Sequence, residues 1–244
     1  MLMPDRMLAR ARLRWFLGQV AVVAAGVFCY FQVRGLTAAA PASAFAHARA
    51  VADLERHVHL DLEATVQAPF IATAAGQTVV NWIYIWGHWP VIIVTMAWLA
   101  WRHRRHFLRL RDAMLVSGAL GLVVFVGFPV APPRLADGEL MDTVTASSRA
   151  YRVLQPPNFV NQYAAMPSLH AGWDLLVGIS IATAAAWVAV RAIGWVLPVL
   201  MSVAVVATGN HYVVDVVAGL ALALVGYAAA LLLERRRDHR AAAP

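Results

Sequence analysis

Two short polar stretches of the chain hold ionisable residues at the edge of an apolar segment. They read NQYAAMPSLHAGWD at Asn161–Asp174 and GNHYVVDVVAG at Gly209–Gly219. Ionisable side chains are costly at a membrane boundary and usually carry chemistry there. Each stretch pairs a histidine with an aspartate four residues later, and residues at that spacing share one helix face. The pattern indicates acid–base or nucleophilic chemistry that the two stretches share.

The pair in the second stretch is His211 and Asp215. If the aspartate accepts a hydrogen bond from one ring nitrogen, the other nitrogen is free to attack or to take a proton. A structural His–Asp bond between helices is the alternative. In the first stretch, His170 falls in the first turn of an expected helix. Asp174 is a candidate to support this histidine, or it is an interfacial carboxylate without a catalytic role.

Residues near the two histidines have the chemistry of an anion site. Pro167 and Ser168 are typical of a helix start, where free N–H groups and the helix dipole attract anions. Arg134 follows two prolines in the sequence APPRL, which stiffen the backbone around it. Its planar guanidinium suits phosphate oxygens, either of a substrate or of lipid headgroups. The polar residues of the two stretches add four candidates for the substrate pocket: Asn161, Tyr163, Asn210 and Tyr212.

Membrane helices must position these residues, because 61% of the 244 residues are hydrophobic and only 14% are charged. Soluble proteins have roughly 45–50% and 25%. We predict an all-α, polytopic membrane protein of one domain, with transmembrane helices at Leu13–Val33, Thr78–Trp101, Ala113–Val130, Ser168–Val190, Ile193–Thr208 and Tyr212–Leu233. The first segment is too long for a signal peptide and is read as an uncleaved anchor. The fifth has only about sixteen residues, so we expect the loop that follows it to be recessed below the outer surface.

Arginines decide the orientation, because the chain has no lysine. Fourteen fall on one side of the expected spans, namely Arg6, Arg10, Arg12, Arg14, Arg102, Arg104, Arg105, Arg109, Arg111, Arg191, Arg235, Arg236, Arg237 and Arg240. The other side has six: Arg34, Arg49, Arg56, Arg134, Arg149 and Arg152. Both termini, residues 1–12 and 234–244, are therefore expected in the cytoplasm, and both histidine stretches on the extracytoplasmic side. The membrane is expected to be the plasma membrane. The net charge of +7 lies in short clusters, which excludes a continuous nucleic-acid surface.

Two further features have two readings each. Residues 42–70 form an amphipathic segment that is expected to lie along the outer interface, where it either packs on the bundle or gates the substrate. On the second span, Asn81, Tyr84 and His88 form a polar stripe at helical spacing. The stripe either lines the cavity of the two histidines or bonds a neighbouring helix.

The motifs resemble those of the type 2 phosphatidic acid phosphatase superfamily of membrane lipid phosphatases and phosphotransferases. PSLH at Pro167–His170 is similar to the second motif of that family, and GNHYVVD at Gly209–Asp215 to the third. With APPRL, the set is closest to the inositolphosphotransferase-like branch, which is related to inositol phosphorylceramide synthases. The resemblance covers roughly residues 45–230 in organisation.

This resemblance implies a two-step mechanism without metal or cofactor. His211 would attack phosphorus to form a phosphohistidine, oriented by Asp215, while His170 protonates the leaving oxygen and later activates the acceptor. Arg134 and the amides around Ser168 would hold the equatorial oxygens.

The chain departs from the wider superfamily at its phosphate clamps. Gly127 stands where the first motif has a lysine, and Ala204 and Val205 replace a Ser-Arg pair of the third motif. Arg149 and Arg152 are candidates to replace the lost charge. The inositolphosphotransferase-like branch is similar in lacking these clamps.

We therefore expect transfer of a phospho-headgroup, inositolphosphate-like, from a membrane lipid to a lipid alcohol, a sugar alcohol or water. A simple lipid or prenyl (pyro)phosphate phosphatase is the alternative. Two further alternatives come from other classes. One is a b-type haem protein with axial ligands among His88, His170 and His211, and the other is a transporter.

Overall fold

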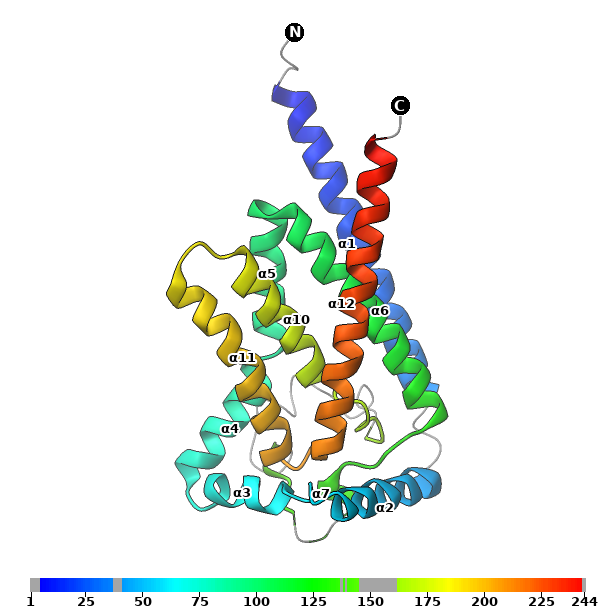
Figure 1. The fold of residues 1–244 in the computed structure, drawn as a ribbon, viewed down its shortest axis with the longest axis vertical. Coiled ribbons are helices and arrows are strands. Elements are labelled where there is room, and N and C mark those ends of the chain that lie inside the picture. Colours follow the sequence, from blue (N-terminus) through cyan, green and yellow to red (C-terminus); the bar gives the residue numbers. More distant parts are fainter. Residues whose placement is uncertain (1–4, 37–40, 137, 139, 145–161, 243–244) are drawn as a thin grey trace.

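The computed structural model describes residues 5–36, 41–136, 138, 140–144 and 162–242, which fold mainly into helices (Figure 1). These are α1 (Asp5–Leu36), α2 (Pro41–His57), α3 (Glu63–Ile71), α4 (Ala74–Trp86), α5 (Trp89–Arg102), α6 (Arg104–Gly127), α7 (Pro133–Ala136), α10 (Leu169–Ala184), α11 (Val188–Ala207) and α12 (Val213–Ala242). No β-strand occurs within these ranges, and the expected all-α fold is confirmed for them.

Several of the helices are apolar enough to make this a membrane protein. Four stretches are long and apolar enough to cross a membrane: α4 and α5 together, α6, α11 and α12. Two other helices, α1 and α10, contain shorter apolar parts at Leu13–Cys29 and Leu169–Ala184. Four of the six expected spans thus meet the length and composition that a bilayer requires, and the other two stay predictions.

The boundary between the fourth and fifth expected spans differs from the prediction. α10 ends at Ala184 and α11 begins at Val188, so Ser168–Val190 was too long and Ile193–Thr208 too short. α11 has 20 residues, and the inference that a short fifth span recesses the following loop is wrong. The short helix is α10, with 16 residues. The break falls at Ala185 in an alanine-rich run. This run stays apolar and contains no glycine or proline, so the hydropathy pattern does not indicate where the helix ends.

The second expected span, Thr78–Trp101, is two helices rather than one. α4 ends at Trp86 and α5 begins at Trp89, with His88 in the non-helical position before it. Pro90 lies in the first turn of α5. In a continuous helix its ring would clash with the carbonyl group of Trp86, which explains the break.

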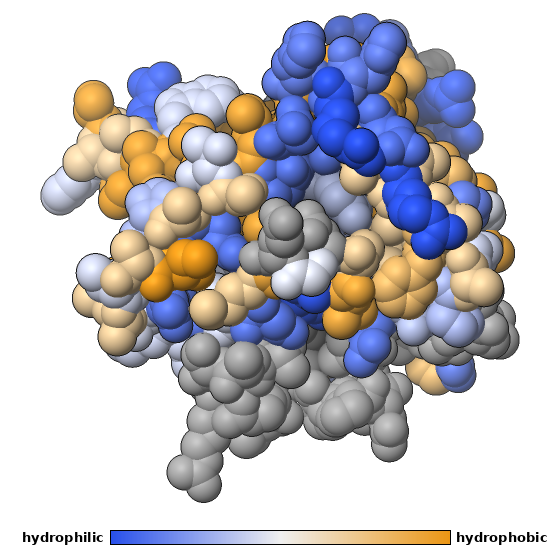
Figure 2. Space-filling model, turned by 90° about the horizontal axis from the view of Figure 1, so that it is seen from below, coloured by the Kyte–Doolittle hydropathy of each residue, from blue (hydrophilic) through white to orange (hydrophobic). Residues whose placement is uncertain are grey.

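The helices α2, α3 and α7 lie across one end of the bundle, while both chain termini lie at the other end (Figure 1). One face of α2, from Ala44 to Glu55, is buried, which confirms its amphipathic pattern. Its apolar residues pack against a cluster that includes Val130, Ala165 and Tyr212. Seen from this end, the surface mixes hydrophilic and hydrophobic residues (Figure 2). The contacts favour packing over gating, and a place at the membrane interface stays a prediction.

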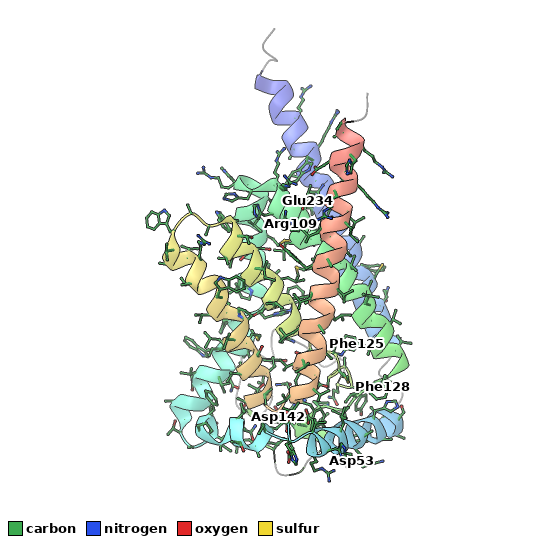
Figure 3. All side chains as sticks on the ribbon, viewed as in Figure 1. Asp53, Arg109, Phe125, Phe128, Asp142 and Glu234 are labelled. Atoms are coloured by element: carbon green, nitrogen blue, oxygen red, sulfur yellow. The ribbon has the colours of Figure 1, made fainter. Side chains whose placement is uncertain are left out.

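Ion pairs tie α6 to α12 toward the end that holds the termini. The Nη2 atom of Arg109 lies 2.8 Å from Oε2 of Glu234, and both residues are labelled in Figure 3. The Nη2 atom of Arg237 lies 2.5 Å from Oδ2 of Asp112. These pairs hold together two helices whose opposite ends approach the histidine motifs.

Candidate active site

His211 lies in a tight turn between α11 and α12. Gly209 has a φ of +69°, a conformation that side chains rarely adopt, and a Cβ there would stand 3.1 Å from the Cβ of Arg134. The backbone N–H groups of Asn210 and His211 both donate to the carbonyl of Val205. The amide side chain of Asn210 donates to Thr208 at 2.9 Å, so this residue stabilises the turn from within.

The ring of His211 is held by a backbone carbonyl. Its Nδ1 lies 2.7 Å from the carbonyl oxygen of Ala165, which can only accept, so Nδ1 carries the proton and Nε2 keeps its lone pair. Asp215 is fully buried, and its Oδ2 lies 3.6 Å from the same Nδ1. That oxygen also accepts the N–H of Tyr212 at 2.9 Å. The carbonyl of Ala165 therefore makes the shorter contact with Nδ1, and the carboxylate of Asp215, which was expected to orient the ring, lies farther from it.

The two histidine motifs meet through close packing of α10 on α12. A Cβ at Gly219 would lie 2.1 Å from the carbonyl oxygen of Ser168, so only glycine permits this approach. Ser168 caps α10, because its hydroxyl accepts the N–H of Ala171 at 3.4 Å. Its own N–H donates to the carbonyl of Asp215 at 2.9 Å. Ser168 thus confirms the predicted helix start, but its amide is used by the protein and is not left for phosphate.

His170 faces the other histidine and the polar stripe of α4. The ring centroids of His170 and His211 lie 6.1 Å apart. The ring of Tyr84 stacks on that of His170, with centroids 4.8 Å apart, and the ring of His88 is tilted against it, with centroids 4.2 Å apart. These two members of the stripe therefore reach the site. The amide group of Asn81 is bonded to Thr143, at 2.8 Å to the carbonyl oxygen and 2.9 Å to the hydroxyl, and its place in the substrate pocket stays a prediction.

Asp174 pairs with His88 from the break between α4 and α5. Oδ1 of Asp174 lies 2.7 Å from Nδ1 of His88, and both side chains are 3% exposed. The expected support of His170 by Asp174 stays a prediction, and the bond that the carboxylate makes is to His88. The partner comes from the break between α4 and α5, a feature that the sequence pattern did not indicate.

Arg134 is buried beside the turn that bears His211. Its backbone N–H donates to the carbonyl of Gly209 at 3.0 Å, and its Nε donates to Asp142 at 3.1 Å. Asp142 is labelled in Figure 3, near the end covered by α2 and α3. The Nη1 atom of Arg134 is buried and has no hydrogen-bond partner within the described part of the chain. A buried guanidinium donor without a partner suits an anion that arrives from outside.

The remaining candidates contribute packing or lie elsewhere. Tyr163 packs edge-on against Phe45 at 6.1 Å, and Tyr212 is 4% exposed in the cluster under α2. Both tyrosines pack in or against this cluster, and their place in the substrate pocket stays a prediction. Three predicted residues, Arg149, Arg152 and Asn161, lie outside the described residues, and their roles stay predictions.

Two glutamates that the sequence analysis did not select hold the start of α12. Glu63 accepts the N–H of Val213 at 2.9 Å, and Glu55 accepts that of Val214 at 2.7 Å. Burial raises the pKa of Glu55 to about 8, and the neighbouring charge of Glu63 adds to this effect. Glu55 falls on the buried face of α2, at the same spacing as its alanines and valine. A charged residue in a buried register is the signal that could have identified it.

The fold and the site define a membrane-embedded helical protein in which a histidine of α10 and a histidine of the turn before α12 meet near a buried arginine. A profile of the PAP2 superfamily matches residues 49–229, most of the chain, and the chain belongs to this superfamily. No curated protein and no solved structure matches it. Membership supports a phosphatase-type activity and gives no support to the haem-protein and transporter alternatives.

Proposed function

We propose that this chain is a membrane lipid phosphatase or phosphotransferase that works through a phosphohistidine on His211. The observation that carries the proposal is the arrangement of the two histidines, one on α10 and one in the turn before α12, whose ring centroids lie 6.1 Å apart. The Nδ1 proton of His211 is held by Ala165, which leaves Nε2 as the nucleophile. The superfamily match supports the same class of reaction.

The first step forms a bond between Nε2 of His211 and phosphorus while the bond to the leaving oxygen breaks. His170, as imidazolium, donates its proton to that oxygen. The phosphorylated ring gains positive charge, which Asp215 stabilises at 3.6 Å from Nδ1. Nη1 of Arg134 binds a nonbridging oxygen, where charge is spread in the transition state.

The second step reverses these roles. His170 takes a proton from the acceptor hydroxyl, whose oxygen attacks phosphorus as the bond to Nε2 of His211 breaks. Water as acceptor yields free phosphate or a phosphomonoester, and an alcohol yields headgroup transfer. Neither step needs a metal or a cofactor.

We favour a phosphodiester substrate and transfer of an inositolphosphate-like headgroup. A phosphodiester carries one negative charge where a phosphomonoester carries up to two. Gly127, Ala204 and Val205 stand where the wider superfamily has a lysine and a Ser-Arg pair that bind phosphate. Arg134 therefore has fewer cations around it, which suits a substrate of smaller charge. Cleavage of a lipid or prenyl phosphate to free phosphate is the alternative.

We place the site on the extracytoplasmic side of the plasma membrane, with both termini in the cytoplasm. The support is the distribution of arginines, fourteen on the side of the termini and six on the side of the histidines. The substrate is then a lipid of the outer leaflet, and the acceptor is a lipid or sugar alcohol or water.

The decisive experiment compares His211→Gln with the purified wild type on phosphatidyl, prenyl-phosphate and inositol lipids labelled at phosphorus. Free phosphate and headgroup transfer are scored separately, and an acid-labile phosphoenzyme is trapped by rapid quenching. We expect His211→Gln to lose both turnover and the trapped species. His47→Gln is the control, because the Nδ1 atom of His47 also lies 2.8 Å from a backbone carbonyl, but in α2. Full activity of His211→Gln would reject the proposal.

A further inference from the structure

The buried pair of His88 and Asp174 has no role in the mechanism described so far. Both side chains are 3% exposed, and the two atoms of the bond lie 2.7 Å apart. A carboxylate accepts, so Nδ1 of His88 carries the proton and the ring can be neutral. Burying such a pair is costly, and a well-packed apolar pair is often as stable. Its place beside the catalytic histidine suggests another reason for it.

The ring of His88 supports the ring of His170 directly. Their centroids are 4.2 Å apart with an interplanar angle of 36°. His88 is itself fixed by Trp89, edge-on at 5.3 Å, and by Trp173, stacked at 6.2 Å. Together with Tyr84, this wall restricts the plane in which the ring of His170 can lie.

The charge of Asp174 reaches His170 through the helix. The two residues are one turn apart on α10, which places their Cβ atoms about 5–6 Å apart. A negative charge at that distance favours the imidazolium form by about two pH units at an effective dielectric constant of about 20. His88 and His170 are too close for both to be cationic without repulsion.

Other titratable groups also face His170. Tyr84 comes from α4, and its phenol ring stacks on that of His170. His211 comes from the turn before α12, and Asp215 stands behind its Nδ1. These groups act on His170 in the wild type and in a variant of the His88–Asp174 pair alike, so a comparison of the two isolates the pair.

We propose that His88 and Asp174 are positioning residues for His170, which fix the plane of its ring and place a negative charge behind it. The ring then holds the proton that the leaving oxygen needs. The catalytic meaning of this arrangement rests on the proposed function, whereas its effect on the protonation of His170 does not.

The test is a titration of histidine resonances by NMR in detergent micelles, combined with the pH dependence of kcat. His170 is identified by the signal that is lost in His170→Asn. In Asp174→Asn the midpoint of the His170 titration should fall by about two pH units, and the alkaline limb of kcat should move with it. Ser180→Ala is the control, because Ser180 is buried on the same helix and bonded only within it.

His88→Asn separates the two roles of the pair. Its amide can still donate to Asp174, so the charge stays in place, but the stacked ring is lost. We expect kcat to fall by about ten- to a hundredfold, as misplacement of a catalytic group does, with a smaller shift of the His170 midpoint.

Unchanged midpoints in Asp174→Asn would overturn the proposal. If that variant does not fold, wild-type kcat in His88→Asn would overturn it instead. A shifted midpoint in a protein that turns over no lipid phosphate would support the positioning role and reject the proposed function.

Discussion

Replacement of Glu55 by glutamine should make the protein less sensitive to alkaline pH. Glu55 is 1% exposed and accepts the N–H of Val214 at the start of α12. Glutamine can accept the same bond and donate to Glu63, as the protonated carboxyl group does. Because burial raises the pKa of Glu55 to about 8 from its ordinary value of 4.5, the folded protein holds a proton there that the unfolded chain releases.

The sign and size of the effect follow from this difference in pKa. Below about pH 4.5 both states are protonated, so Glu55 makes no difference. From there to about pH 8 only the folded state keeps the proton, and the free energy of unfolding falls by about 1.4 kcal/mol per pH unit. Over the whole window the loss is about 5 kcal/mol, and it then levels off. Glu55→Gln lacks this loss.

The assay is thermal unfolding in detergent, followed by tryptophan fluorescence at several values between pH 5 and pH 9. The midpoint of Glu55→Gln should exceed that of the wild type by an amount that grows with pH to about 10–20 °C. Asp53→Asn is the control, because Asp53 lies on the same helix but is 67% exposed (Figure 3). A difference between Glu55→Gln and the wild type that stays constant across this range would refute the reasoning.

Two other substitutions test the close approaches that build the site. Gly219→Ala should cost about 1–3 kcal/mol of stability and most of the activity, because the new Cβ meets the carbonyl of Ser168 at 2.1 Å. Gly127→Ala meets nothing within 4 Å and should unfold at the wild-type temperature; equal effects of the two would contradict this account. Arg134→Lys should reduce kcat/KM by about 10²–10³, because a lysine loses the planar set of donors that would bind phosphate. Unchanged kcat/KM in a folded protein would remove this arginine from the site.

The sequence by itself determined the class of the protein and its principal motifs. Hydropathy and composition predicted an all-helical membrane protein, because burial in lipid is read from local runs of apolar residues. The start of α10 at Ser168 and the turn at Gly209 were also local, since caps and glycine turns depend on a few neighbouring residues.

Only the tertiary structure decided which groups become partners. Asp174 lies one turn from His170, yet it bonds His88. A proline breaks the second expected span beside His88, and this break lets the ring of His88 turn toward Asp174. The carbonyl of Ala165 holds His211, and a backbone acceptor has no signature in the sequence. The same holds for the N–H groups of Val213 and Val214, which are accepted by Glu63 and Glu55 from far along the chain. Helix packing brings such atoms within bonding distance, and spacing along the chain does not encode that distance.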